Sequence, residues 1–256
     1  MTVGVIAPSG PVCDPRLAQG LQQIKSRGYR LILGEHIHDR RGYLAGTDIH
    51  RAADFTTMFA RQDVDAVFCA RGGYGASRML DYIDWEVVRA NPKLFVGYSD
   101  ITTLHLALEK RTGLVTVYGP MVVTYGGGLS ETAEECFWRM VTRAEPFGRY
   151  NTGDAAIKTL VGGKARGRLA GGCLALLGAA VGTPEEPDFT DRIVLIEDVG
   201  EAIYRIDRLL VQLLRAGLLQ KAAGFVIGTV TNYEDTQTEE PFIRLEDVWQ
   251  DHIVPL

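Results

Sequence analysis

Short apolar runs alternate with amphipathic segments along the first half of the chain. Five of these runs are dense enough in apolar residues for buried strands: 2–7, 29–33, 64–70, 94–96 and 114–118. The segments between and after them repeat apolar residues every three or four positions, as surface helices do, at 15–26, 49–60, 76–80, 101–110 and 131–142. Because strands that alternate with helices form a parallel sheet covered on both faces, the pattern predicts an α/β fold.

The pattern changes after residue 142. The segment 143–154 has no periodicity and collects Pro, Gly, Asn and Asp, which is typical of a linker. We therefore expect a first domain over residues 1–145, a linker over 146–156 and a second domain over 157–256.

The second domain differs in texture from the first. Two strand-like runs, 156–161 and 164–169, flank Gly162-Gly163, and this arrangement predicts a β-hairpin. Gly171-Gly172-Cys173 is expected to open a helix of small residues. The remaining strands are expected at 192–196 and 223–230, and the remaining helices at 174–181, 202–218 and 245–252.

Composition narrows the class of protein. The 256 residues are 46% hydrophobic and 23% charged, as in an ordinary globular protein with a sizeable core. A net charge of −5 argues against nucleic acid or an anionic membrane as the main partner. No apolar run approaches the roughly 18 residues of a membrane span, and the first residues show no secretory signal. We therefore expect a cytoplasmic protein that binds neither nucleic acid nor membrane.

The residue types that bind metals are present without a metal-binding spacing. His36, His38 and His50 gather in or beside the polar segment 35–48, but no carboxylate or thiol pattern accompanies them. Since a metal site needs several ligands in a defined geometry, we expect a solvated loop, no metal and no cofactor. The cysteines have no C-x-x-C spacing and are expected to be reduced thiols: Cys13, Cys69, Cys136 and Cys173.

A candidate nucleophile stands where the strand at 94–96 turns into a helix. The turn reads Gly97-Tyr98-Ser99-Asp100, and a Gly-x-Ser at such a turn holds the hydroxyl beside the free N–H groups of the helix start. The match to the G-x-S-x-G pattern is incomplete, because Ile101 replaces the last glycine. Taken alone, this stretch is better explained by a helix cap, because Ser and Asp are ordinary N-cap residues.

The segment RGGYG, residues 71–75, follows the buried strand at 64–70. In a parallel α/β sheet the ligand site lies at the carboxyl ends of the strands, so this turn and Ser99 are expected at the same edge. Glycines there let the backbone approach a ligand and present N–H groups. A tight turn with positive φ angles accounts for them as well.

A serine nucleophile needs a general base, and a histidine base usually needs a carboxylate to orient it. Glu197 follows a buried apolar strand and is the right kind of group in a suitable place. An ion pair with Arg205 or Arg208 is the alternative. Asp198 and Glu201 compete with Glu197 for the catalytic role, and spacing does not separate them.

Several blocks of the chain resemble L,D-carboxypeptidases of the serine peptidase S66 group. In the order found in that family, they are RGGYG (71–75), VGYSDIT (96–102), YGPM (118–121), the Gly-Gly-Cys stretch (171–184) and LIEDVGEAIYRIDRLL (195–210). The resemblance implies a flavodoxin-like first domain, a smaller β-rich second domain, an active site between them and a homodimer. It also implies metal-independent cleavage of the L,D-bond to the terminal D-alanine of murein tetrapeptides, small peptides of cell-wall recycling.

The resemblance assigns roles to individual residues. Ser99 matches the nucleophile and Glu197 the triad acid. The backbone N–H groups of Gly73 and Asp100 match the donors of the oxyanion hole. Tyr74, within the RGGYG block, is expected to contact the substrate.

The chain departs from the family pattern in three places. The triad histidine belongs in a Gly-rich loop, which we expect beyond Leu256 in a C-terminal tail. His252 lies in a helical segment and is not assigned to the triad. His105 is expected to pack within its helix. Tyr118 stands where many relatives have histidine, and Cys173 where they usually have asparagine. Both positions are expected near the substrate, with Tyr118 in contact with it.

Two other functions fit parts of the pattern. Related hydrolases cleave peptide–nucleotide antibiotics and confer self-immunity, but they need an aromatic surface, and the expected loop 124–130 offers only Tyr125. A catalytically silent ligand-binding protein of the same fold is the second alternative, favoured by the missing histidine.

Overall fold

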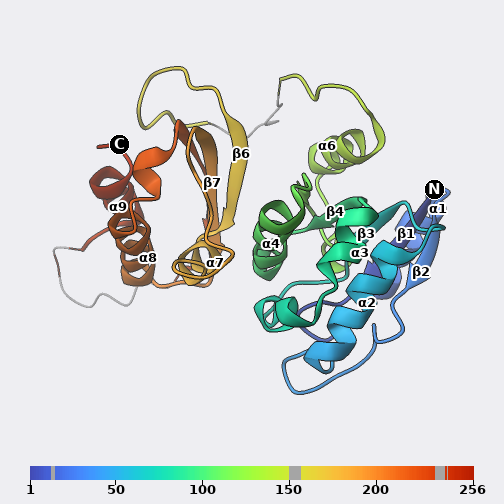
Figure 1. Cartoon of the computed structure of the whole chain (residues 1–256). Helices are drawn as coiled ribbons and strands as arrows, with labels where there is room; N and C mark the ends of the chain where they lie inside the picture. Colours follow the sequence, from blue (N-terminus) through green and yellow to red (C-terminus); the bar gives the residue numbers. More distant parts are fainter. Residues whose placement is uncertain (13–14, 150–156, 234–239, 241) are drawn as a thin grey trace. The chain divides into compact units, whose positions relative to one another are not determined.

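A computed structural model describes residues 1–12, 15–149, 157–233, 240 and 242–256. The chain divides into two compact units, Met1–Ala156 and Ile157–Leu256 (Figure 1). The expected linker at 146–156 falls mostly outside the described residues, so its boundaries stay a prediction.

The first unit is built on a five-stranded sheet whose neighbouring strands all run parallel, in the order β2-β1-β3-β4-β5. The strands are β1 (Thr2–Ile6), β2 (Arg30–Leu33), β3 (Ala66–Cys69), β4 (Leu94–Gly97) and β5 (Val117–Tyr118). This order is that of flavodoxin, in which the strand order reverses between β1 and β3. The expected α/β, flavodoxin-like class is confirmed.

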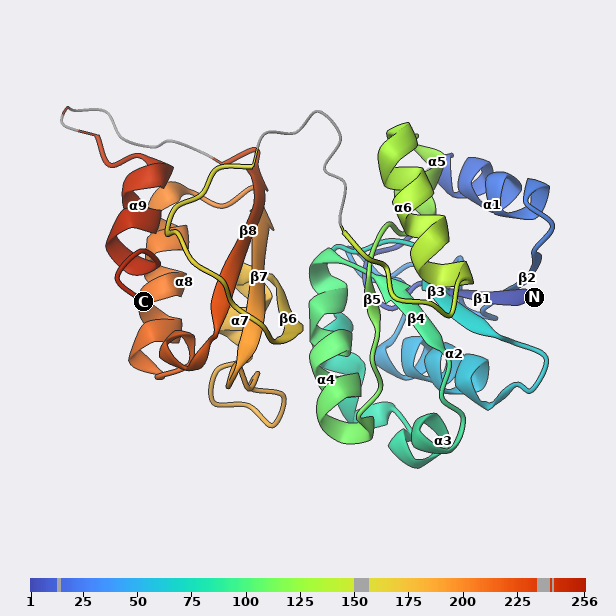
Figure 2. The ribbon, with the colours of Figure 1, turned by 90° about the horizontal axis from the view of Figure 1, so that it is seen from above.

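Helices cover both faces of this sheet. They are α1 (Arg16–Ser26), α2 (Asp48–Ala60), η1 (Ala76–Tyr82), α3 (Trp85–Ala90), η2 (Ser99–Ile101), α4 (Thr102–Thr112), α5 (Val122–Gly126) and α6 (Glu131–Thr142), where η1 and η2 are 3₁₀-helices. Figure 2 shows α1, α5 and α6 on one face of the sheet and α2 and α3 on the other.

The strands are apolar throughout because both of their faces are buried. In β3, Val67 and Cys69 pack into the core on the α2 side, whereas Ala66 and Phe68 pack on the α1 side. Alternate residues therefore enter two separate cores. A strand whose two faces are both buried needs apolar residues at every position, and this explains why these strands are continuous apolar runs in the sequence.

Helix α5 lies where the sequence predicts a loop. It packs against α1 so closely that a β carbon at Gly126 would lie 2.0 Å from the Arg16 carbonyl oxygen, and one at Gly20 2.1 Å from the Val122 oxygen. The two glycines make this approach possible. The prediction failed because the contact depends on missing side chains, which apolar periodicity does not register.

The second unit has its own parallel sheet, in the order β6-β7-β8. Its elements are β6 (Arg168–Cys173), α7 (Leu174–Ala179), β7 (Arg192–Val199), α8 (Ile203–Arg215), the 3₁₀-helix η3 (Leu219–Lys221), β8 (Gly224–Thr231) and α9 (Leu245–His252). Helix α8 packs against both α7 and α9. No helix in the described part of the chain has the length and apolar character needed to cross a membrane.

The predicted β-hairpin is wrong. Residues 157–167 contain no strand, and β6 runs parallel to β7 instead. Gly171 and Gly172 lie in this strand, and the expected helix begins directly after it, at Leu174 with Cys173 as its N-cap. With φ at 108°, Gly171 approaches β7 so closely that a β carbon would lie 2.0 Å from the Leu195 oxygen. The glycines mark a close backbone contact rather than a turn.

Candidate active site

Ser99 lies directly beyond β4 in a strained backbone conformation. Its φ is 64°, in the left-handed region that costs an L-residue about 1–2 kcal/mol. The turn is tight, since a β carbon at Gly97 would lie 2.7 Å from the Ile101 side chain. Strain of this kind concentrates at functional sites, where surrounding contacts maintain it.

Those contacts come mainly from Tyr118 at the end of β5. The Ser99 N–H donates to the Tyr118 hydroxyl at 3.0 Å, and the Thr102 hydroxyl donates to the same oxygen at 3.4 Å. The Tyr118 ring packs on Tyr98 and His105, with centroids 6.3 and 5.5 Å apart. Tyr118 therefore fixes the backbone of the candidate nucleophile. A contact with substrate, expected from the sequence, stays a prediction.

The RGGYG turn lies against Ser99, as expected because both follow strands that end at the same edge of the sheet. A β carbon at Gly72 would lie 3.3 Å from Ser99 Oγ and 3.2 Å from its Cβ, so a side chain there would crowd the hydroxyl. Gly73 has a φ of 125°, and the Gly10 N–H beyond β1 donates to the Gly72 oxygen at 3.2 Å. Within the described ranges, neither the Gly73 amide nor the Asp100 amide donates a hydrogen bond to a residue outside its own helix or turn. Both remain suitable as oxyanion donors.

The Asp100 side chain has a different task from capping its own helix. It is buried, and its Oδ2 accepts hydrogen bonds from the Ser9 hydroxyl at 2.6 Å and from the Ala76 N–H at 2.9 Å. Burial raises the pKa of this carboxyl, and the hydrogen bond from Ser9 opposes the rise. No side-chain cap is present at the start of η2 or α4. The capping interpretation of Ser99 and Asp100 therefore fails.

His105 is not a base for Ser99. Its Nε2 lies 2.9 Å from the Gly97 carbonyl oxygen and its Nδ1 lies 2.7 Å from the Thr116 hydroxyl. Since a carbonyl only accepts, Nε2 carries the proton and Nδ1 accepts from Thr116. Burial lowers the pKa of His105 to about 4, so the ring is neutral at pH 7. It holds the chain two residues before the candidate nucleophile.

This buried imidazole predicts acid sensitivity. The unfolded state takes up a proton near the ordinary pKa of 6.5, whereas folded His105 does so only near 4, so the free energy of unfolding falls as pH drops through this window. The full loss is about 3 kcal/mol. Urea unfolding of the wild type and His105→Asn at several pH values measures it. The variant lacks this part of the pH dependence, and equal slopes for both proteins would contradict the assignment.

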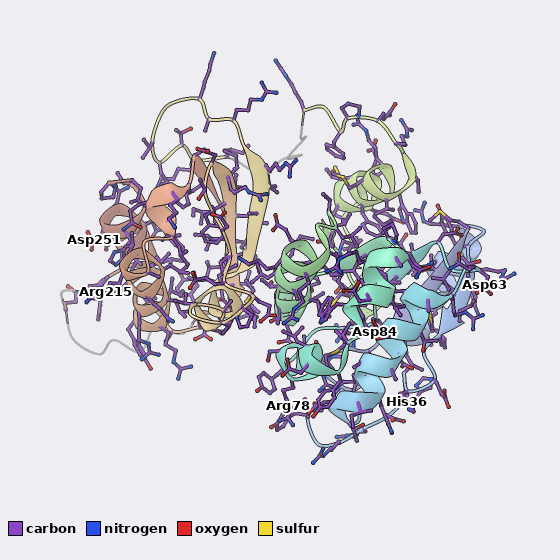
Figure 3. The ribbon with its side chains drawn as sticks, in the orientation of Figure 1. His36, Asp63, Arg78, Asp84, Arg215 and Asp251 are labelled. Carbon is purple, nitrogen blue, oxygen red and sulfur yellow. The ribbon has the colours of Figure 1, made fainter. Side chains whose placement is uncertain are left out.

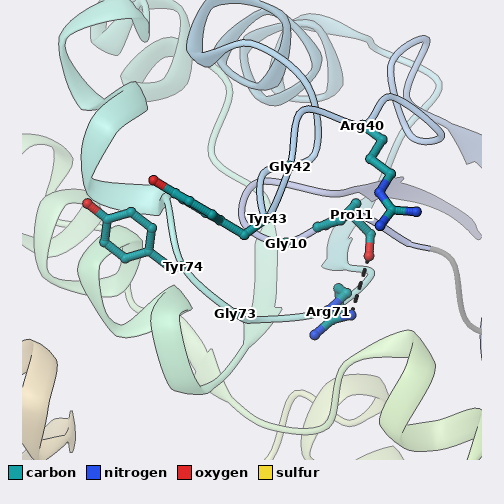
Figure 4. Close-up of a pocket in the computed structure, with 8 residues that line it drawn as sticks. All are labelled: Gly10, Pro11, Arg40, Gly42, Tyr43, Arg71, Gly73 and Tyr74. Atoms are coloured by element: carbon teal, nitrogen blue, oxygen red, sulfur yellow. Dashed lines mark hydrogen bonds between the residues drawn. The ribbon is translucent and has the colours of Figure 1, made fainter.

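A pocket of about 760 Å³ opens beside Gly73, between the ends of β1 and β3. This is the crevice where the strand order reverses, the usual ligand position in such sheets. Figure 4 shows the residues around it: Gly10, Pro11, Arg40, Gly42, Tyr43, Arg71, Gly73 and Tyr74. The Arg71 guanidinium is held in the wall by the carbonyl oxygens of Pro11 at 3.3 Å and Gly72 at 3.2 Å.

Aromatic side chains form another part of this wall. Tyr74 is half exposed, and its ring lies 5.8 Å from that of Tyr43, which is exposed as well. Sequence reasoning found Tyr74 and missed Tyr43 and Arg71. The position of Arg71 immediately after β3, at the binding edge of the sheet, was a usable signal. Tyr43 comes from a loop remote in sequence and gave none.

Three carboxylates of the second unit are candidates for the catalytic acid, and they lie in different surroundings. Asp198 is buried and its Oδ2 accepts from the Ala175 N–H at 2.8 Å, in the first turn of α7. Glu201 lies 3.6 Å from Arg205 on the same surface. Glu197 is half-buried at an irregularity in the pairing of β7 with β8. Asp198 thus holds the start of α7 and Glu201 forms an ion pair with Arg205, while the role of Glu197 as triad acid stays a prediction.

Two further residues of this unit have structural roles. The Cys173 thiol is buried beside Asp198, with Sγ 3.7 Å from Oδ1, and burial raises its pKa. His252 in α9 bonds Asp207 of α8 through Nε2 at 2.7 Å. This contact ties two helices together and supports leaving His252 out of the triad.

Known proteins share this architecture along nearly the whole chain. Residues 3–119 match the LD-carboxypeptidase N-terminal domain, and residues 166–256 match the LD-carboxypeptidase C-terminal domain. The chain belongs to the LD-carboxypeptidase family. It is therefore an enzyme, a serine carboxypeptidase of the S66 class, as the sequence motifs indicate.

Individual members of the family agree with this membership. A putative carboxypeptidase of Streptomyces coelicolor is 44% identical, over 94% of this chain and 78% of its own. A probable murein peptide carboxypeptidase of Bacillus subtilis is 40% identical, over 99% and 79%. The crystal structure of muramoyltetrapeptide carboxypeptidase from Oxalobacter formigenes superposes with a TM-score of 0.86 at 30% identity, over 98% of this chain and 83% of that one.

Proposed function

We propose that this enzyme removes the terminal D-alanine from murein tetrapeptides by cleaving an L,D-peptide bond, with Ser99 as nucleophile. The observation that carries the proposal is the left-handed Ser99, held with its hydroxyl against Gly72 at the binding edge of the sheet. The names of the Bacillus and Oxalobacter relatives support the substrate class.

In the proposed mechanism, Ser99 Oγ attacks the carbonyl that precedes the D-residue. The N–H groups of Gly73 and Asp100 stabilise the oxyanion, the C–N bond then breaks and the proton taken from Ser99 passes to the departing amine of D-alanine, and water hydrolyses the acyl-enzyme. In this scheme a histidine takes the serine proton, and Glu197 orients that histidine. His105 is excluded from this task because both of its ring nitrogens are already bonded.

A carboxypeptidase must also hold the free carboxylate of its substrate. Arg71 is the proposed partner, because its guanidinium is fixed in the pocket wall next to Gly73 and matches a carboxylate in shape and charge. Arg71→Gln is expected to raise KM for the tetrapeptide at least about tenfold, the value of one charged hydrogen bond, with a smaller change in kcat. Steady-state kinetics test this role, and an unchanged KM would remove Arg71 from it.

Tyr118 is expected to affect kcat through the Ser99 backbone. In Tyr118→Phe the Ser99 N–H loses its acceptor, at a cost of about 1–3 kcal/mol. We expect kcat to fall about 10- to 100-fold as the nucleophile drifts from its position. Tyr98→Phe is the matched control, because the Tyr98 hydroxyl bonds Thr124 and not Ser99. Equal kcat values for the two variants would contradict the role of Tyr118.

The decisive experiment compares a murein tetrapeptide that ends in an L,D-bond with its L,L-linked isomer. The proposal requires hydrolysis of the first and negligible turnover of the second; the reverse preference overturns it. A processed peptide–nucleotide serves as a third substrate. Tyr125, the aromatic candidate for holding a nucleotide, is buried and its hydroxyl donates to Glu134, so it offers no stacking surface.

The assembly and location of the enzyme follow from the same resemblance. We propose a cytoplasmic homodimer. Light scattering on the purified enzyme gives the mass of the particle, and a monomer at working concentration would refute the dimer.

A further inference from the structure

Two histidines and one carboxylate meet on the surface of the first unit, outside the pocket described above. His36 Nδ1 lies 3.1 Å and His50 Nδ1 lies 2.8 Å from the same atom, Asp39 Oδ2. The three potential ligand atoms all lie within 4.8 Å of one another. Figure 3 labels His36 beside α2. The sequence predicted a solvated loop here, because no carboxylate or thiol pattern accompanies the histidines.

The backbone around this cluster is built to hold it. Asp39 packs on Gly46, where φ is 84° and a β carbon would lie 2.7 Å from the Asp39 Cβ. The His36 N–H donates to the buried Asp54 carboxylate, at 3.1 Å from Oδ2. His50 lies in the first turn of α2. Each candidate ligand is thus positioned by a contact that the cluster itself does not supply.

The spacing of the ligand atoms suits a tetrahedral ion. Zinc lies about 2.0–2.1 Å from nitrogen and oxygen ligands, which places two tetrahedral ligand atoms about 3.3 Å apart. The observed separations of 3.1 and 2.8 Å need only a small expansion.

The imidazole rings must turn before both can bind one ion. They are stacked, with centroids 3.9 Å apart and planes within 17° of parallel, and both Nδ1 atoms lie at hydrogen-bond distance from the Asp39 oxygen, so an ion must displace these contacts. The side chains of His36 and His50 are 24% and 44% exposed, which leaves them room to rotate. Ion binding is therefore expected to break the stack and keep Asp39 in place.

We propose that His36, Asp39 and His50 form a binding site for a divalent transition-metal ion of the zinc class, completed by water. Two imidazoles and one carboxylate suit zinc and its neighbours better than calcium or magnesium, which prefer oxygen ligands. The site lies at the base of the loop that carries Arg40 and Tyr43 into the pocket. A bound ion would clamp this loop to α2.

The test uses the purified enzyme after chelator treatment, titrated with Co²⁺ and, separately, Zn²⁺. We expect one ion per chain and a cobalt spectrum without the sulfur-to-cobalt charge-transfer band, since no thiol takes part. His50→Ala and Asp39→Asn should weaken binding by at least about 100-fold, because even outer-shell changes cost about 10–100-fold. His38→Ala is the matched control, an exposed histidine of the same loop, and should bind like the wild type.

Thermal unfolding provides a second measurement. Zn²⁺ should raise the melting temperature of the wild type and of His38→Ala but not of His50→Ala, as binding linkage requires. The proposal fails if the wild type binds no ion, if it binds no more tightly than His50→Ala, or if the cobalt spectrum shows thiolate ligands. Circular dichroism of the metal-free variants confirms that each one is folded.

Discussion

Ser99→Ala is expected to lower kcat for the tetrapeptide by about 10⁶-fold, the effect of removing a serine nucleophile from a triad. Among the atoms nearest to a β carbon at Gly72, Ser99 Oγ is the one hydroxyl oxygen, so no hydroxyl there replaces it. Substrate binding is retained, because the pocket residues and the two amides are unchanged. Single-turnover kinetics with an L,D-linked peptide measure the loss of acyl-enzyme formation.

Ser99→Gly is the informative partner of that variant. Glycine adopts the left-handed conformation without strain, so Ser99→Gly should be more stable than Ser99→Ala by about 1 kcal/mol, although both lack activity. Urea unfolding of the two proteins gives the difference. If Ser99→Ala keeps wild-type turnover, Ser99 is not the nucleophile; if Ser99→Gly is the less stable variant, the backbone is not strained.

The first sheet could be predicted from the chain because its strands are buried on both faces. Such strands read as unbroken apolar runs, and the helices between them have regular apolar spacing. Where glycine determines a contact, the same reasoning failed. Gly20 and Gly126 let α5 approach α1, and Gly171 lets β6 approach β7. Hydrophobic patterns are read from side chains, whereas the α1–α5 and β6–β7 contacts form where glycine has no side chain.

Part of the candidate site could likewise be predicted from the sequence, and part could not. Ser99 and the glycines of RGGYG were found because each directly follows a strand, and strand ends share one edge of a parallel sheet. The hydrogen bond from Ser99 to Tyr118 joins the turn after β4 to the end of β5, and the contact of His36 with His50 joins a loop to a helix. Both contacts depend on tertiary packing. Spacing along the chain therefore could not reveal them.

Glu197→Gln is the second change with a large expected effect. If Glu197 orients the histidine base, the neutral amide no longer fixes the tautomer or stabilises the imidazolium, and kcat should fall by about 10⁴-fold. KM should change little, because the acid does not bind the substrate. The same protein should unfold at nearly the wild-type temperature, since glutamine keeps the size and shape of the half-buried side chain.

Two neighbouring carboxylates, Glu201 and Asp198, provide control variants for this prediction. Glu201→Gln makes the same chemical change four positions away and removes only an exposed ion pair with Arg205, so its kcat should match the wild type. Asp198→Asn should lower stability, because the Ala175 N–H at the start of α7 loses a charged acceptor. A wild-type kcat in Glu197→Gln together with a large loss in Asp198→Asn, measured on folded protein, would move the catalytic acid to Asp198. The structure argues against that outcome, because both oxygens of Asp198 already accept backbone N–H groups, from Ala175 and Val199.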